Sequence, residues 1–442
     1  MAFSKILFRG MARTHSCLSS LHTWKDAASI WPVVAPASQK TRSVAAGLVL
    51  LTAGGLGTLR CDEQCDCSRI SPADEACMRS AASSAHVGIR LEHGGPFGAS
   101  VVRDGVIISC SHNMVLHNKD PTCHAEMTAI RAACKALGTH DLSDCHLYTT
   151  CEPCPMCWGA VQWSRVGRAY IGVDRHIAAK YGFDDKVFYD EVDSKAGIYG
   201  LRRSGYIIDT SNPNSKAQSE RVEKNMVEIH NGILRESCEA LFQNPTVNRS
   251  LKRRYSRHTA DLHEAAKKAF PEPILPNATT NSQHEMYMQM AIDAAQRGVK
   301  GGVSKEREPF GTVIVKDGVV IAQACNTVTS SKDCTSTSEV NAIVAACANL
   351  GTYNLEGCDM YTVAQPDVMS LGAILWSRMS RVYCGVTQQF AAQYGFEEAS
   401  VHFQDLQLPD KAHRVCEVVE GVSVEECEQV FREWSDRNGV IY

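Results

Sequence analysis

EPCPMC, which is Glu152 to Cys157, and QPDVMS, which is Gln365 to Ser370, are two versions of one stretch within a single chain. Both follow a Tyr-Thr dipeptide and precede a Gly-Ala dipeptide at the same spacing. A shift of 213 residues lays residues 96–185 over residues 309–398 without a gap, and 42 of these 90 positions are identical. Unrelated segments share far fewer positions, so the sequence predicts a domain that is present twice.

The two copies share one expected order of helices and strands. In the first copy, Asp104-Gly105 indicates a β-hairpin. Helices are expected from about His124 and from Cys154, with strands near residues 145–150 and 168–173. Strands that alternate with helices are typical of a layered α/β domain.

The repeat divides the chain into four expected segments. The copies match again near their ends, where the first copy holds 24 additional residues in a Ser- and Asn-rich region that we interpret as a surface loop. The segment between the copies has no counterpart in either and is interpreted as a linker. The expected segments are a targeting or apolar N-terminal segment (1–70), a first domain (71–243), a linker (244–283) and a second domain (284–442).

The composition is that of a globular protein. Hydrophobic residues make up 44% of the 442 residues, and the formal net charge is −4. A chain without a strong basic field is poorly suited to holding a polyanion, so nucleic acid is not expected as the main partner. The 20 cysteines are spread along a long chain, which indicates reduced thiols rather than a secreted disulfide scaffold.

The N-terminal segment differs from the rest. Its first 60 residues contain seven Lys or Arg and a single acid, Asp26, a composition that predicts a mitochondrial transit peptide, with a cytoplasmic location as the alternative. Residues 43–59 run 17 positions without charge, whereas a membrane span needs about 20. They are interpreted as a short membrane anchor, part of an import signal or a flexible tether. Cys61, Cys65 and Cys67 form either a metal cluster or, more simply, a solvated loop.

One cluster of side chains in the first copy predicts a zinc site. His124 supplies an imidazole, and Cys154 and Cys157 supply two thiolates from a Cys-x-x-Cys pair. Three protein ligands that leave a fourth position open are typical of a catalytic zinc. Glu126 lies two residues after His124, so on a helix it points away from the ion yet reaches water bound there. This His-x-Glu and Pro-Cys-x-x-Cys signature is that of zinc nucleobase deaminases, in which the Glu moves protons. A structural zinc or a redox pair is the alternative interpretation.

The first copy resembles the guanine deaminases of bacterial type, within the cytidine deaminase superfamily. The resemblance covers Gly94 to about Val192, and the second copy follows it in less detail. The combination of PCPMC with GFDD is more specific than the superfamily motif and points to a free purine base. The stretches that carry the resemblance are GGPFGASVVRDG, HNKDPTCHAEMTAIRAACKALG, CHLYTTCEPCPMCWGAVQW and KYGFDDKVFYDEV.

The resemblance implies a three-layer α/β/α domain with a mixed five-stranded sheet, present twice. It also implies that Asn113 hydrogen-bonds the purine, that Phe97 stacks on it and that Asp185 recognises it. The residues alone, without the resemblance, favour a turn residue at Asn113 and a core aromatic at Phe97. By analogy with the dimers of this family, the C-terminal segment ending in Tyr442 is expected to cross to the first domain and to close over its site.

The second copy lacks the expected metal ligands. Under the shift of 213 residues, His124 becomes Thr337, and the two cysteines become Asp367 and Ser370, while the acid remains as Glu339. Thr and Ser are poor zinc ligands and one carboxylate does not hold the ion. The second copy is therefore expected to fold, to be catalytically inactive and to act as a built-in partner of the first.

The expected reaction is zinc-dependent hydrolysis of guanine to xanthine and ammonia, with zinc as the cofactor and a purine base and water as the small-molecule partners. Three alternatives stay open. The first is a tRNA adenosine deaminase with a built-in pseudo-subunit. The second is a deaminase of guanosine or another aminopurine. The third is a zinc-stabilised scaffold without turnover, although Glu126 would have no use there.

Overall fold

The computed structural model describes residues 70–183, 205–207, 227–247, 278–300, 308–396 and 416–437. The N-terminal segment with its expected import signal, the inserted loop and most of the linker lie outside these ranges. So do two expected substrate contacts, Asp185 and Tyr442. Within the described ranges, no helix combines the length and the apolar character that crossing a bilayer requires.

The first domain is built on a mixed sheet in the order β2-β1-β3-β4-β6-β5. Strand β1 is antiparallel to both β2 and β3, whereas β3, β4, β6 and β5 run parallel. The elements are α1 (Pro72–Arg90), β1 (Gly98–Arg103), β2 (Val106–His112), α2 (Val115–Asn118), α3 (Ala125–Leu137), β3 (Cys145–Cys151), α4 (Pro155–Trp163), β4 (Arg168–Val173), α5 (Arg175–Lys180), β5 (Gly205–Ile207), β6 (Val227–Asn231) and α8 (Arg235–Phe242).

The second domain repeats this arrangement with the order β11-β10-β9-β7-β8. Its helix α10 starts within the last residues of the expected linker. The elements are α10 (Ala278–Lys300), β7 (Gly311–Lys316), β8 (Val319–Cys325), α11 (Val328–Ser331), α12 (Ser338–Leu350), β9 (Cys358–Ala364), α13 (Val368–Trp376), β10 (Arg381–Val386), α14 (Gln388–Ala392), β11 (Glu417–Glu420) and α16 (Val424–Asp436).

The mixed five-stranded sheet expected in each copy is confirmed. In the first domain the short strand β5 extends it by pairing with β6, so the described sheet there has six strands. The repeat reaches fine detail, because the register of the hairpin shifts after Val101 in one copy and after Ile314 in the other. The turn at Asp104-Gly105 has two residues with positive φ, of 50° and 73°, as a two-residue hairpin requires.

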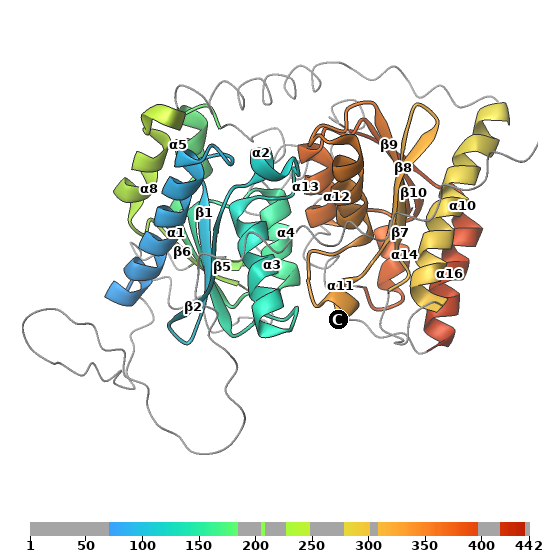
Figure 1. Ribbon diagram of the computed structural model, residues 1–442. Helices are drawn as coiled ribbons and strands as arrows, with labels where there is room; N and C mark the ends of the chain where they lie inside the picture. Colours follow the sequence, from blue (N-terminus) through green and yellow to red (C-terminus); the bar gives the residue numbers. More distant parts are fainter. Residues whose placement is uncertain are drawn as a thin grey trace, which may run out of the picture. The chain divides into compact units, whose positions relative to one another are not determined.

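Helices cover both faces of each sheet, which gives the expected three layers (Figure 1). In the first domain, α1 and α8 cover one face and α3 and α4 the other. In the second domain, α10 and α16 take the place of α1 and α8, and α12 and α13 that of α3 and α4. The N-termini of α3 and α4 come together on one face of the first sheet, and this is where the expected zinc ligands lie.

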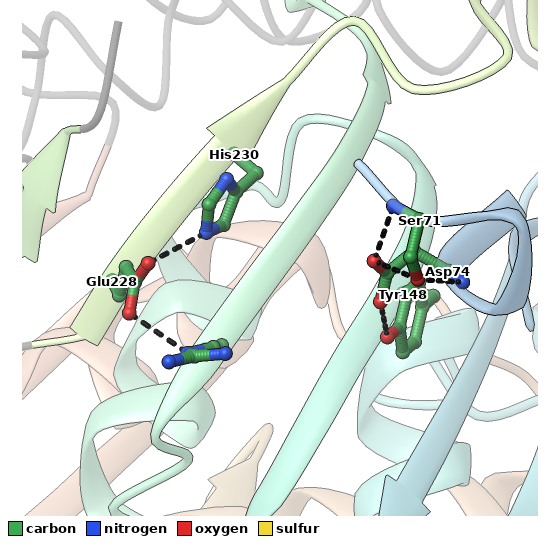
Figure 2. Close-up of polar contacts among 6 residues, drawn as sticks. Ser71, Asp74, Tyr148, Glu228 and His230 are labelled. Carbon is green, nitrogen blue, oxygen red and sulfur yellow. Dashed lines mark hydrogen bonds and ion pairs between the residues drawn. The ribbon is translucent and has the colours of Figure 1, made fainter. Parts of the chain in front are cut away.

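Hydrogen bonds fix the outer helix of the first domain to its sheet (Figure 2). Ser71 and Asp74 form a capping box at the start of α1, and the hydroxyl of Tyr148 in β3 donates to Asp74 at 2.6 Å. A capping box satisfies two backbone N–H groups that the helix leaves unpaired.

In the neighbouring strands, the Glu228 carboxylate accepts from His230 Nε2 at 2.8 Å and from Arg168 Nε at 2.8 Å.

Candidate active site

Two of the expected ligands stand directly before helices. His124 is the N-cap of α3 and Cys154 the N-cap of α4, each with extended backbone angles. Neither side chain caps its own helix by a hydrogen bond. Pro155 is the first residue of α4, where its missing N–H costs nothing. The imidazole of His124 and the thiol of Cys154 therefore point toward each other and not toward the backbone N–H groups of their own helices.

The spacing of the three ligand atoms fits a zinc ion. The sulfurs of Cys154 and Cys157 are 3.7 Å apart, and they lie 3.5 Å and 3.6 Å from Nδ1 of His124. Tetrahedral zinc with ordinary bond lengths requires about 3.8 Å between two sulfurs and about 3.6 Å between sulfur and nitrogen. Among the described residues, these three are the group whose geometry could hold a metal.

The two thiols of the Cys-x-x-Cys pair shift in opposite directions, because burial and the interaction with Cys154 raise the pKa of Cys157 well above its usual range. Burial opposes ionisation of the Cys154 thiol, but hydrogen bonding with Cys157 and the charge of His124 bring the pKa of Cys154 well below its usual range. The N-terminus of α4 adds partial positive charge, which also favours a thiolate. Thiolate is the form that binds metal, so this donor set suits zinc.

Glu126 lies in the first turn of α3 and is only 5% exposed. The hydroxyl of Thr149 donates to its Oε1 at 2.8 Å, and its Oε2 lies 3.5 Å from the sulfur of Cys157. Burial raises the pKa of Glu126. The carboxyl group is thus held beside the three ligand atoms, outside the group that could bind the metal, in surroundings where it can accept and release a proton.

The structure describes two of the residues expected to contact the substrate, Asn113 and Phe97. The backbone N–H of Asn113 donates to the carbonyl of Phe97 at 3.0 Å, and its Oδ1 accepts from the N–H of Val115 at 3.2 Å. A Cβ at Gly94 would collide with Oδ1 and the backbone of Asn113, so only glycine allows this approach. Phe97 packs edge-to-face against Phe183 at 5.5 Å between ring centroids. Asn113 is thus indeed a turn residue, and Phe97 belongs to an aromatic cluster. Neither role excludes contact with a base.

In the second domain, the residues at the positions of the expected metal ligands make hydrogen bonds within the domain. Thr337 accepts from the N–H of Val340, and Asp367 accepts from the N–H of Ser370 at 2.8 Å, so both residues cap their own helices. The hydroxyls of Thr337 and Ser370 lie 3.0 Å apart. Glu339 keeps the place of Glu126 and accepts from Thr362 at 2.6 Å. Each position that could bind metal in the first domain makes an internal contact here.

One residue at the site is not among those expected from the sequence. Trp376, at the end of α13, donates its indole N–H to the sulfur of Cys154 at 3.4 Å. Its ring also meets the imidazole of His124 edge-on, with 4.8 Å between centroids. The sequence offered only an indirect signal, because Trp376 matches Trp163 under the repeat. The second domain therefore contributes a side chain to the candidate metal centre.

Comparison with known proteins agrees with this geometry. The cytidine and deoxycytidylate deaminase zinc-binding region matches the chain twice, at residues 71–173 and 281–386. Guanine deaminase from Bacillus subtilis is 48% identical over 122 residues, which are 28% of this chain and 78% of that protein. Its crystal structure aligns at 49% identity over 27% of this chain and 76% of that chain, with a TM-score of 0.27. A tRNA-specific adenosine deaminase from Aquifex aeolicus is 54% identical over 71 residues, 16% of this chain and 47% of that enzyme.

These matches and the His, Cys and Cys group define a class of hydrolytic deaminases that act on nucleobases or nucleotides. The chain belongs to the cytidine and deoxycytidylate deaminase family and carries the zinc-binding region of that family twice. The second region has the family fold, although its ligand positions hold Thr337, Asp367 and Ser370.

Proposed function

We propose that the first domain deaminates guanine hydrolytically to xanthine and ammonia, with zinc held by His124, Cys154 and Cys157. The observation that carries the proposal is the position of Glu126, 3.5 Å from the sulfur of Cys157 in a group whose spacing fits zinc. The choice of guanine is supported by the 48% identity to a guanine deaminase.

Bound zinc would make water more acidic and thus easier to deprotonate at neutral pH. Glu126 accepts a proton from the attacking water, whose oxygen bonds to the ring carbon that carries the exocyclic amine. Glu126 delivers this proton to the ring nitrogen, then takes the second proton from the new hydroxyl group on the carbon and delivers it to the amine. The carbon–nitrogen bond breaks, and ammonia leaves. Thr149 holds Oε1 of Glu126 through these transfers.

We propose that four residues recognise the purine. Asn113 would hydrogen-bond a polar edge of the ring, and Phe97 would stack against its face. Asp185 and Tyr442 complete the proposed set, with Tyr442 on a segment that would close over the bound base and exclude water.

We further propose that the second domain serves as an internal partner. Reciprocal contacts support this pairing. A Cβ at Gly159 of α4 would lie 2.6 Å from Met369 in α13, and one at Gly372 of α13 would lie 2.6 Å from Met156 in α4. Contacts that repeat in both directions are typical of a two-fold interface between like subunits. Arg131 adds a hydrogen bond to Thr335 at 2.8 Å.

The test is a panel of free bases and nucleosides incubated with the purified chain, with released ammonia as the measurement. Guanine should be the best substrate by kcat/KM. Turnover of adenosine in tRNA, together with tight tRNA binding, would instead favour the activity of the Aquifex relative, a tRNA-specific adenosine deaminase.

The location of the protein in the cell is a separate proposal, supported by the basic, acid-poor N-terminus alone. Residues 1–70 fused to a fluorescent protein should direct it to mitochondria, whereas a diffuse cytoplasmic signal would contradict the proposal.

A further inference from the structure

The second domain holds a pocket at the position that corresponds to the active site of the first. It has a volume of about 590 Å³, open solvent at its mouth included. Its lining includes Glu308, Phe310, Asn326, Glu339, Asp367 and Trp163. The second domain therefore has a pocket lined by Thr337 and Asp367, which match His124 and Cys154 of the first domain.

The polar lining of this pocket is acidic where the first domain would hold a cation. Glu308 stands in the place of Gly95, and Asp367 in the place of Cys154. Glu339, which matches Glu126, is a third acid of this pocket. The second domain therefore has two more acids than the first at these matched positions. Glu308 is 2% exposed, and its Oε2 accepts from the amide of Asn326 at 2.9 Å. The amide thus fixes the carboxylate in place. An ionised carboxylate only accepts hydrogen bonds, so a ligand that binds to Glu308 would carry a donor.

The apolar lining consists of aromatic rings. Phe310 and Phe396 meet edge-to-face at 4.9 Å between centroids, and each is partly exposed. Trp163 reaches the pocket from α4 of the first domain and hydrogen-bonds Asp367. Rings with exposed faces favour a flat ligand, because any planar base can stack on them. A pocket that combines aromatic rings with fixed carboxylates selects its ligand more narrowly than a cluster of acidic side chains alone.

We propose that this pocket is a second, non-catalytic binding site for a planar nitrogen heterocycle that presents adjacent N–H donors, such as a 2-amino-6-oxopurine. Two neighbouring N–H groups on one ring edge match the two oxygens of a carboxylate, which is a strong and directional pairing. Glu308 and Asp367 would accept from the ring edge while Phe310 stacks on its face. The base would not be hydrolysed there, because the positions of the metal ligands hold Thr337, Asp367 and Ser370.

The experiment uses the full chain with Glu126→Gln, so that bound base is not consumed, and guanine as the probe. The choice of guanine rests on the proposed function of the first domain. Equilibrium dialysis with labelled guanine should give two bases per chain. Glu308→Gln, which keeps shape and removes charge, should weaken one of the two sites by about tenfold or more. Phe310→Leu should weaken the same site.

The matched control is Phe97→Leu, which should weaken the other site only. One base per chain, lost with Phe97→Leu and unchanged by Glu308→Gln, would overturn the inference. One base that responds to Glu308→Gln and not to Phe97→Leu would support the inference while contradicting the proposed function. Zinc content should stay unchanged in all variants, and a cooperative melting transition should show that each variant is folded. A second metal ion that disappears with Glu308→Gln would also overturn the inference, because it would make the pocket a cation site.

Discussion

The indole nitrogen of Trp376 lies 3.4 Å from the sulfur of Cys154, although 222 positions separate the two residues in the chain. A hydrogen bond to a metal-binding thiolate draws charge from the sulfur and fixes its orientation. The second domain thus contributes a hydrogen bond to Cys154, one of the residues proposed to hold zinc.

Removing this contact should weaken the metal centre without unfolding it. Trp376→Phe keeps an aromatic ring against His124 and deletes the donor. Partners of metal ligands are commonly worth about 10–100-fold in metal affinity or activity. We expect the affinity for zinc, measured by competition with a chelator, to fall by about tenfold or more. Trp163→Phe, the equivalent change in the first domain, should leave zinc affinity unchanged, and equal effects of both variants would contradict this assignment.

Zinc content should depend on the first domain alone. The intact chain is expected to contain about one zinc, and Cys157→Ala should abolish it, because two remaining ligands hold the ion poorly. Ser370→Ala, at the matching position of the second domain, is the control and should retain the metal. Elemental analysis decides the matter, and two ions in the intact chain would show that the second domain binds metal after all.

Glu126→Gln should separate metal binding from chemistry. The substitution preserves the shape of a side chain that is only 5% exposed and removes its capacity to shuttle protons. Turnover should fall by more than the ~10²–10⁴ typical of general acid–base catalysis, since one carboxyl group handles several transfers. Zinc content should remain. Glu339→Gln in the second domain should leave turnover unaltered, and activity of Glu126→Gln within tenfold of the parent would defeat the mechanism.

Asp367 should make stability depend on pH. Burial raises its pKa from 3.8 to about 7, against hydrogen bonds that lower it, including one from Trp163. A carboxyl group that binds its proton more tightly when folded costs stability as pH rises from about 4 to about 7. Asp367→Asn keeps a good helix cap. Its Tm should therefore exceed that of the parent by a few degrees at pH 8, with a smaller difference at pH 5.

Asp74 provides the comparison of opposite sign. Burial alone would raise its pKa, but hydrogen bonds from Ser71 and Tyr148 bring the pKa of Asp74 below 3.8. Its contribution to stability is present above the unfolded value and disappears as pH falls through the folded one. Asp74→Asn should accordingly lower the Tm at pH 8. The same direction of change for both variants would contradict the assigned environments.

The sequence predicted much of this molecule because local signals carry the information. The spacing of His124, Cys154 and Cys157 identified the ligand group, and the hairpin at Asp104-Gly105 needed only its two residues. Trp376 escaped prediction because its contact with Cys154 depends on how two distant helices pack. Glu308 was not predicted because only the folded structure shows that it lines a pocket. In the sequence it is one acid among many.

The replacement of ligands by helix caps makes the loss of metal in the second domain hard to reverse. Restoring histidine at Thr337 or cysteine at Asp367 would remove a side chain that now satisfies a backbone N–H at a helix start. Each such cap contributes about 1 kcal/mol. A single reversion would therefore carry a penalty at once and gain nothing until the remaining ligands followed. The helix caps of the second domain would thus oppose a step-by-step introduction of metal ligands into this half of the protein.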